Sequence, residues 1–226
     1  YSFDLAGACS GFLFGLENCS ALIESGRYKK IILVAAEKMS AITNYEDRTT
    51  CPLFGDGAAA VLLEPTTDDL GVIDSFLRVD GLGQSHLHQK AGGSERPASI
   101  ETVTNREHFV YQEGPAVFKH AVSDMSAVTE GIMKRNHLTA ADLSWFVPHQ
   151  ANMRIIEAVG KRIDLPKEKI LINIENFGNT SAASVPLCLW DFESRLRKGD
   201  NIILAAFGAG FSWGSVYLKW GYDAVK

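Results

Sequence analysis

The sequence has few cysteines, no excess of positive charge and no long apolar run. Its four cysteines, Cys9, Cys19, Cys51 and Cys188, show no C-x-x-C or C-x-x-H spacing, which argues against a zinc centre or a disulfide framework and favours reduced thiols. The net charge of −5 argues against a general nucleic-acid binder. No apolar run reaches the length of a bilayer span and no signal peptide is present, so we expect no membrane insertion and a cytoplasmic location.

The composition nevertheless allows a substantial core. The 226 residues are 46% hydrophobic, which suits one large domain or two small ones. The first residue is Tyr1 rather than methionine, and it lies in a stretch, residues 1–5, whose apolar and polar residues alternate as in a half-buried strand. We therefore expect the sequence to begin partway through a larger gene product.

The local pattern changes at residues 5–12 (LAGACSGF), where small residues surround a single thiol. Apolar residues then recur at helical spacing as far as Ser25 and Gly26, a typical helix end. Cys9 is thus expected on a tight turn at the start of a helix, where unpaired N–H groups and the helix dipole favour a thiolate. The alternative is a small apolar cysteine packed under the helix.

Strands and helices alternate along the rest of the chain. Residues 29–36 are typical of a strand buried on both faces of a sheet, and residues 37–52 of a surface loop over the site. Residues 81–108 are loop-like and contain His86 and His88, but no third metal ligand stands nearby. The remaining expected elements are strands at 58–63, 72–79, 143–148, 201–206 and from about 211 to 220, an extended segment at 170–174, and helices at 114–136, 149–163 and from about 184 to 198.

One pattern occurs twice. Small residues at a helix start, a helix, a glycine and an apolar strand occupy residues 7–36 and again residues 178–206. Each strand is followed by Phe-Gly-x-Gly and a further strand, over residues 54–63 and 207–218. Two copies of one α/β unit predict a pseudo-twofold layered fold with the site between the halves.

Four short motifs carry the candidate chemistry. In chain order they are residues 4–12 (DLAGACSGF), 147–152 (VPHQAN), 176–182 (NFGNTSA) and 207–214 (FGAGFSWG). Together, and in this order over almost the whole chain, they resemble β-ketoacyl-acyl-carrier-protein synthase III, the initiating condensing enzyme of type II fatty-acid synthesis.

The resemblance implies a thiolase-like layered α/β fold with two pseudo-repeated halves, in which the N-terminal part of the first half is missing. Residues 1–108 are then the remainder of the N-terminal half, with the nucleophilic cysteine. Residues 109–226 are the C-terminal half, with the catalytic histidine and asparagine. The implied activity is that of an acyltransferase that condenses an acyl-CoA, with acetyl-CoA the expected starter, with malonyl-acyl carrier protein. The CoA thioester and the carrier phosphopantetheine are substrates, and no cofactor or metal is implied.

The resemblance also implies the roles of individual residues. Cys9 carries the acyl group, while His149 Nε2–H and the Asn179 amide stabilise the enolate that forms as carbon dioxide leaves. The backbone N–H groups of Cys9 and Ala209 hold the oxyanion of the tetrahedral intermediate. Taken singly, His149 and Asn179 are also explained as capping residues at helix starts.

Binding residues follow from the same resemblance. Arg48 matches the arginine for the CoA nucleotide, Asn152 a residue along the pantetheine channel and Phe118 a wall residue. Pro115 stands where many members have a polar residue. An acidic carrier protein needs a basic docking surface, and four residues are candidates for it: Lys119, Arg154, Lys161 and Arg162.

We also expect a homodimer. The strand predicted over residues 1–5 would be an aggregation liability at a sheet edge, and in the resembling family it pairs with its copy in a second subunit. Two alternatives to the initiating enzyme stay open: a related synthase for polyketide or quinolone precursors, and a non-catalytic interaction subunit. The second would be expected to lose the thiol that Cys9 provides.

Overall fold

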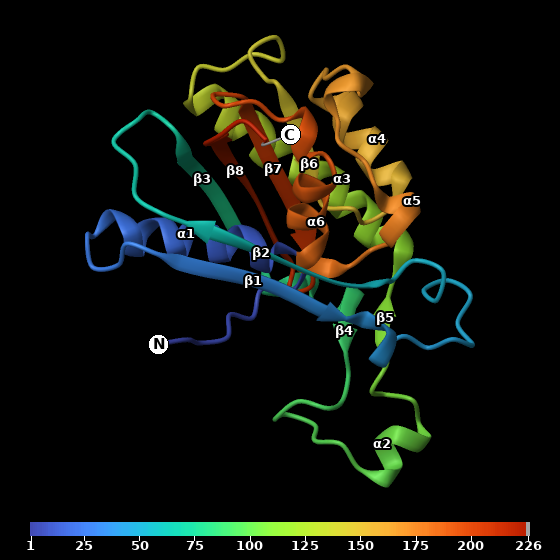
Figure 1. Cartoon of the computed structure of the whole chain (residues 1–226). Coiled ribbons are helices and arrows are strands. Elements are labelled where there is room, and N and C mark those ends of the chain that lie inside the picture. Colours follow the sequence, from blue (N-terminus) through green and yellow to red (C-terminus); the bar gives the residue numbers. More distant parts are fainter. Residues whose placement is uncertain (225–226) are drawn as a thin grey trace.

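A computed structural model describes residues 1–224 and contains three β-sheets, two of which are layered with helices (Figure 1). The strands that build the two sheets are β1 (Ile31–Lys38), β2 (Asp56–Leu63), β3 (Gly71–Val79), β6 (Trp145–Pro148), β7 (Asn201–Gly208) and β8 (Ser212–Lys219). The larger sheet has the order β3-β8-β7-β6 and is antiparallel except for the parallel pair β6–β7. The smaller sheet is the antiparallel pair β1–β2.

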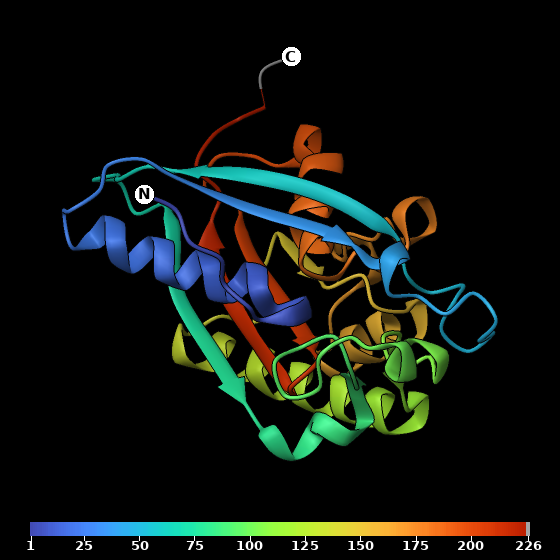
Figure 2. The same ribbon diagram turned by 90° about the horizontal axis from the view of Figure 1, so that it is seen from below.

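Helices α1 (Gly11–Glu24) and α6 (Ser184–Asp191) form the layer between the two sheets (Figures 1 and 2). Phe12 and Leu13 of α1 are buried in one cluster with Leu204 of β7 and Val216 of β8. Their helical spacing matches the apolar pattern of the sequence, so the burial of this face explains why the segment forms a helix. The predicted end of the helix is also confirmed, because Gly26 has φ 73° just beyond it.

Helices α3 (Gly114–Arg135) and α4 (Met153–Arg162) cover the other face of the larger sheet (Figure 2). Met125 and Ile132 of α3 and Ile156 of α4 are buried against Ile203 of β7. The predicted helices at 114–136 and 149–163 are therefore confirmed, the second with a later start. Within residues 1–224, no helix is both long and apolar enough to cross a bilayer.

The predicted internal repeat has a structural counterpart. A 3-10 turn begins with a residue of positive φ in both copies: Ala8 (φ 45°) before α1 and Ser181 (φ 50°) before α6. Each helix is followed by an antiparallel strand pair, β1–β2 in one copy and β7–β8 in the other.

The division into residues 1–108 and 109–226 stays a prediction. Strand β3, from the first range, is hydrogen-bonded to β8 in the second.

The strand predicted over residues 1–5 is wrong. These residues form no helix or strand, and the side chains of Tyr1 and Phe3 are 85% and 61% exposed. Tyr1 instead stacks on Phe3 and contacts the ring of Tyr28. Alternation produces a strand only where a neighbouring strand supplies hydrogen bonds, and no strand of residues 1–224 does so here.

The expectation that residues 29–36 are buried on both faces is also wrong. Ile32 and Val34 of β1 are 68% and 58% exposed, whereas Ala35 is buried. One face of the β1–β2 pair packs on the α1 layer, and within the described residues no element covers the other face. The continuous apolar run signalled a strand correctly, but the number of covered faces depends on what packs against it.

The last predicted helix is shorter than expected, since α6 ends at Asp191 rather than near residue 198. The chain turns through a short 3-10 segment, Glu193–Arg195, and Leu196 beyond it is completely buried. The guanidinium of Arg195 lies 4.6 Å from the ring centre of Trp145. Burial of Leu196 in the core requires this turn, so tertiary packing overrides the helical pattern here.

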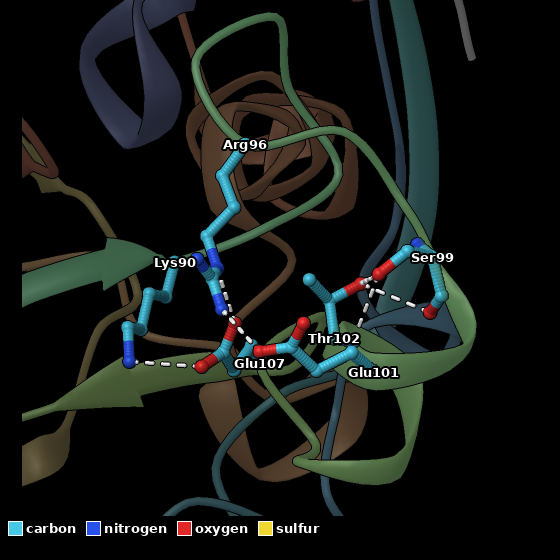
Figure 3. A network of polar contacts seen from close by, with 6 residues as sticks. All are labelled: Lys90, Arg96, Ser99, Glu101, Thr102 and Glu107. Atoms are coloured by element: carbon cyan, nitrogen blue, oxygen red, sulfur yellow. Dashed lines mark hydrogen bonds and ion pairs between the residues drawn. The ribbon is translucent and has the colours of Figure 1, made fainter.

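The segment 81–108 is less irregular than predicted. Together with the residues that follow it, it forms a projection with β4 (Leu87–Gln89) paired to β5 (Val110–Gln112) and a short helix α2 (Ile100–Thr104) at its far end (Figure 1). Figure 3 shows Lys90 and Arg96 converging on Glu107, and Ser99 and Thr102 forming a capping box at α2. These contacts order a segment whose glycines alone predict a loop.

Candidate active site

A cavity of about 730 Å³ opens where the β7–β8 turn, the loop before β2 and the first turns of α3 and α4 meet. Cys9, His149 and Asn179, which were predicted from three separate motifs, all line it. Segments 170 residues apart in the chain thus contribute to one concave site, as expected for a small-molecule pocket between layers.

Cys9 lies in the 3-10 turn Ala8–Ser10 that immediately precedes α1, as predicted. The turn is held against the β7–β8 hairpin, since Ser10 Oγ donates to the Ser212 carbonyl at 2.9 Å. The backbone of Gly208 lies directly against this turn, because a Cβ at this position would be only 2.7 Å from the Cys9 backbone nitrogen. The glycine of the Phe-Gly-x-Gly motif therefore provides the space that the nucleophile turn occupies.

The electrostatic surroundings of Cys9 differ from the expectation. Burial raises the pKa of the thiol to about 11, with a hydrogen bond from Ser181 lowering it and the Glu37 carboxylate raising it further. A helix N-terminus contributes roughly 0.3–1 kcal/mol, which is less than one pKa unit. The expected bias of the helix end towards the thiolate therefore offsets only part of the effect of burial.

His149 follows β6 directly and is 1% exposed. Its backbone N–H donates to the Ala205 carbonyl at 2.7 Å, which continues the β6–β7 ladder by one residue. Its Nδ1 lies 2.6 Å from Ser184 Oγ. Burial lowers the pKa of the imidazole to about 4, so the ring is neutral at pH 7. His149 does not cap α4, because Asn152 Oδ1 fills that role by accepting from the Arg154 N–H.

The burial of neutral His149 predicts a pH-dependent stability. The folded pKa of about 4 is below the unfolded value of 6.5, so the unfolded state binds more protons between these values. The free energy of unfolding therefore falls as pH drops through this window, by on the order of 3 kcal/mol for this group. Urea unfolding at about pH 7 and about pH 4 should show that the free energy of unfolding falls less for His149→Gln than for the chain with His149. Equal losses in the two proteins would contradict the assignment.

Asn179 is fixed by its own main chain. Its N–H donates to the Leu53 carbonyl at 2.8 Å, and its carbonyl accepts from the Gly55 N–H at 3.0 Å. Side-chain Oδ1 accepts from the Ser181 N–H at 2.9 Å, a cap-like contact at the turn before α6. Since Oδ1 is occupied, the Nδ2 group is the part of Asn179 that remains to donate to a ligand in the cavity.

The remaining predicted residues fall into two groups. Those that line the cavity are Phe118, Asn152, Arg154 and Ala209. Arg154 lies with its guanidinium 5.4 Å from the ring centre of Phe118, which holds it near the rim. Within residues 1–224 the Ala209 N–H has no acceptor, as a backbone oxyanion donor requires. The exposed residues outside the lining are Arg48, Lys119, Lys161 and Arg162.

Several residues that shape the site were not singled out from the sequence. Gln150 is buried, and its Oε1 accepts from the backbone N–H groups of Asn173 and Ile174. Ser184, next to the NTSA motif, reaches back to His149. The sequence does show polar residues close to the candidate catalytic residues, and that was the available signal. It does not show which hydrogen-bond partners Gln150 and Ser184 have.

The fold and the site define the class: a thiolase-like α/β enzyme with a Cys-His-Asn site, an arrangement suited to acyl transfer. Comparison with family models agrees. Residues 3–81 match the model for 3-oxoacyl-[acyl-carrier-protein] synthase III, and residues 133–220 match that for the C-terminal part of the same enzyme.

Individual relatives support the same assignment. The chain is 61% identical over its whole length to β-ketoacyl-[acyl-carrier-protein] synthase III 2 of Bacteroides thetaiotaomicron and covers 68% of that protein. It is similar in structure to 3-oxoacyl-(acyl carrier protein) synthase III from Pseudomonas aeruginosa PAO1, at 36% identity and a TM-score of 0.89, over 99% of this chain and 68% of that one. The priming β-ketosynthase of the R1128 polyketide pathway is also similar, at 31% identity and a TM-score of 0.87, over 98% of this chain and 66% of that one. The chain belongs to the β-ketoacyl-[acyl-carrier-protein] synthase III family, acyltransferases of fatty-acid biosynthesis.

Proposed function

We propose that this chain condenses an acyl-CoA, with acetyl-CoA as the expected starter, with malonyl-acyl carrier protein to give a 3-oxoacyl-acyl carrier protein, which initiates fatty-acid synthesis. The observation that carries the proposal is the meeting of Cys9, His149 and Asn179 in one cavity. A thiol carries the acyl group, and two neutral N–H donors stabilise an enolate without removing a proton.

In the first half-reaction, Cys9 Sγ attacks the thioester carbon of acyl-CoA. The tetrahedral oxyanion accepts hydrogen bonds from the backbone N–H groups of Cys9 and Ala209. The intermediate collapses to the acyl-Cys9 thioester, and CoA leaves with the proton that Cys9 gave up. Neutral His149 supplies no positive charge beside the Cys9 thiolate. The thiolate fraction of Cys9 is therefore set by its burial, the Ser181 hydrogen bond, the Glu37 carboxylate and the helix end.

In the second half-reaction, the malonyl thioester of the carrier loses carbon dioxide. The electron pair of the broken bond forms an enolate, whose oxygen accepts from His149 Nε2–H and Asn179 Nδ2–H. The enolate carbon then attacks the acyl-Cys9 carbonyl, and Cys9 leaves as the thiolate. Protonation of this thiolate returns the enzyme to its starting state.

The direct test is to follow both half-reactions on this chain. Incubation with acetyl-CoA should add one acetyl group at Cys9 in a peptide mass map. Later addition of malonyl-acyl carrier protein should remove the acetyl group and give acetoacetyl-acyl carrier protein. Absence of an adduct on correctly folded protein would favour the non-catalytic interaction subunit.

A second candidate, a synthase that primes a polyketide, is favoured by the similarity to the R1128 priming ketosynthase. Both candidates use the same chemistry and differ in the starter acyl group. The rates of Cys9 acylation by a series of acyl-CoA chain lengths distinguish them, since a preference for longer or branched starters over acetyl-CoA would support the second.

For substrate binding, we propose that Phe118 and Asn152 contact the pantetheine arm and that Arg48 pairs with the CoA nucleotide. The support is that Phe118 and Asn152 line the cavity, while Arg48 lies exposed in the loop that leads to it.

We propose that Lys119, Arg154, Lys161 and Arg162 dock the acidic carrier protein. Lys161→Glu, an exposed change outside the cavity lining, should raise the KM for malonyl-acyl carrier protein about tenfold and leave acylation by acetyl-CoA nearly unchanged, because like charges then face each other at the docking surface. The effect should shrink as salt rises. Lys134→Glu, an exposed change at the far end of α3, is the matched control. A defect that does not depend on salt would point instead to a disturbed α4.

A homodimer is proposed on new grounds, because the strand that first suggested it is absent. Exposed apolar side chains lie along residues 1–3 and along β1, including Phe3, Ile32 and Val34. Sedimentation at micromolar concentration should show a dimer, and Phe3→Arg should dissociate it and reduce activity together. An active monomer would end this proposal.

The four free cysteines support a reducing, cytoplasmic compartment.

A further inference from the structure

Ser184 is the first residue of α6 and contacts His149, but unlike His149 it does not line the cavity. Its Oγ is 2.6 Å from His149 Nδ1 and 3.2 Å from the backbone nitrogen of Gln150. Ser184 is 2% exposed and His149 1% exposed. Polar groups buried to this extent need partners, so the direction of each hydrogen bond can be derived.

The hydrogens of this cluster can be counted. The Gln150 N–H is a donor, so Ser184 Oγ accepts in that contact. The Ser184 hydroxyl has one hydrogen of its own, and within residues 1–224 the only acceptor recorded for it is His149 Nδ1. If Nδ1 carried the hydrogen instead, the Ser184 hydroxyl would be left buried without an acceptor, which disfavours that tautomer.

We propose that Ser184 is a positioning residue that holds neutral His149 in the tautomer with the hydrogen on Nε2. Nδ1 accepts from Ser184, so Nε2 presents an N–H to the cavity, next to the Nδ2 group of Asn179. This tautomer donates to an enolate oxygen and cannot accept the proton of Cys9. The catalytic consequence rests on the proposed function, whereas the tautomer itself does not.

The start of α6 also connects the two proposed enolate donors, His149 and Asn179. Asn179 Oδ1 is bound to the Ser181 N–H, and Ser181 and Ser184 are the first residues of the 3-10 turn and of α6. The start of this one helix therefore orients both donors. Small displacements of α6 would move them together, which preserves their relative geometry.

The test is the protonation pattern of the ring nitrogens, measured by ¹⁵N NMR on histidine-labelled chain at about pH 7, with His149→Gln to assign the signals. Unchanged protein should show Nε2 protonated and Nδ1 unprotonated. Ser184→Ala should shift the pattern towards a mixture of tautomers, and Ser184→Thr, which keeps the hydroxyl, should restore it. A spectrum of the unchanged chain with the hydrogen on Nδ1 overturns the proposal, as does an unaltered pattern in folded Ser184→Ala.

A kinetic readout follows the same variants. Ser184→Ala should slow malonyl decarboxylation by roughly tenfold. This loss is smaller than the about 10⁴-fold loss of rate for a catalytic histidine held entirely in the wrong tautomer, because the variant gives a mixture of tautomers. Ser184→Thr should recover most of the rate. A chain with the hydrogen on Nε2 but without condensation activity would contradict the proposed function and leave the tautomer proposal standing. A chain that is active but carries the hydrogen on Nδ1 would contradict the tautomer proposal and leave the proposed function standing.

Discussion

Cys9→Ser should lower acyl transfer from acetyl-CoA by more than about 10³-fold while leaving the fold intact. A serine hydroxyl is a far weaker nucleophile at neutral pH than a thiol, and the turn Ala8–Ser10 contains no base to activate it. His149 is neutral with a pKa of about 4, and its Nδ1 is engaged by Ser184. The site therefore depends on the intrinsic reactivity of sulfur.

The measurement is acetyl transfer from labelled acetyl-CoA, together with the thermal unfolding midpoint of each variant. Cys51→Ser is the matched control, since Cys51 is also a free, half-buried thiol but does not line the cavity. It should retain the activity of the unchanged chain. Near-normal condensation by Cys9→Ser would remove Cys9 from the nucleophile role.

His149→Ala and Asn179→Ala should each lose malonyl decarboxylation by about 10²–10³-fold, on the order of 3 kcal/mol for one oxyanion donor. Both variants should still form acetyl-Cys9, because the thiolate fraction of Cys9 does not depend on a proton acceptor at His149 or Asn179. The two half-reactions are measured separately, acetylation by mass and decarboxylation by release of labelled carbon dioxide from malonyl-acyl carrier protein.

Asn179→Asp separates the chemical role of this residue from its structural one. An aspartate keeps the Oδ1 acceptor for the Ser181 N–H but replaces the Nδ2 donor with an oxygen. It should therefore fold like the unchanged chain and still fail to decarboxylate. If Asn179→Asp decarboxylated normally, or if either alanine variant blocked acetylation as severely as decarboxylation, the division of labour between the residues would be wrong.

Much of the fold could be predicted from local patterns. Helices α1 and α3 and strands β1, β2, β3, β7 and β8 lie where apolar spacing and glycine stops placed them. The errors occur where a neighbour decides the outcome. Residues 1–5 alternate like a strand but have no strand beside them among residues 1–224, and α6 stops early because Leu196 turns into the core.

The site shows the same division. The motifs around Cys9, His149 and Asn179 identified the residues and their order, because each sits at a turn whose small or polar residues are fixed locally. That these turns face one cavity follows from the pairing of β6 with β7 and from the close contact of Gly208 with Cys9. Such contacts join segments far apart in the chain, so they cannot be read from local spacing.

The sequence by itself determined the reactive groups, the helices and strands that present them and the repeat that relates the two copies. Only the tertiary structure decided their protonation. Burial raises the pKa of Cys9 to about 11 against the effect of the helix end, and burial lowers that of His149 to about 4. Protonation depends on the water and partners that the packed chain leaves around each group, and the hydroxyl of Ser184 reaches Nδ1 of His149 only because α6 folds against the end of β6.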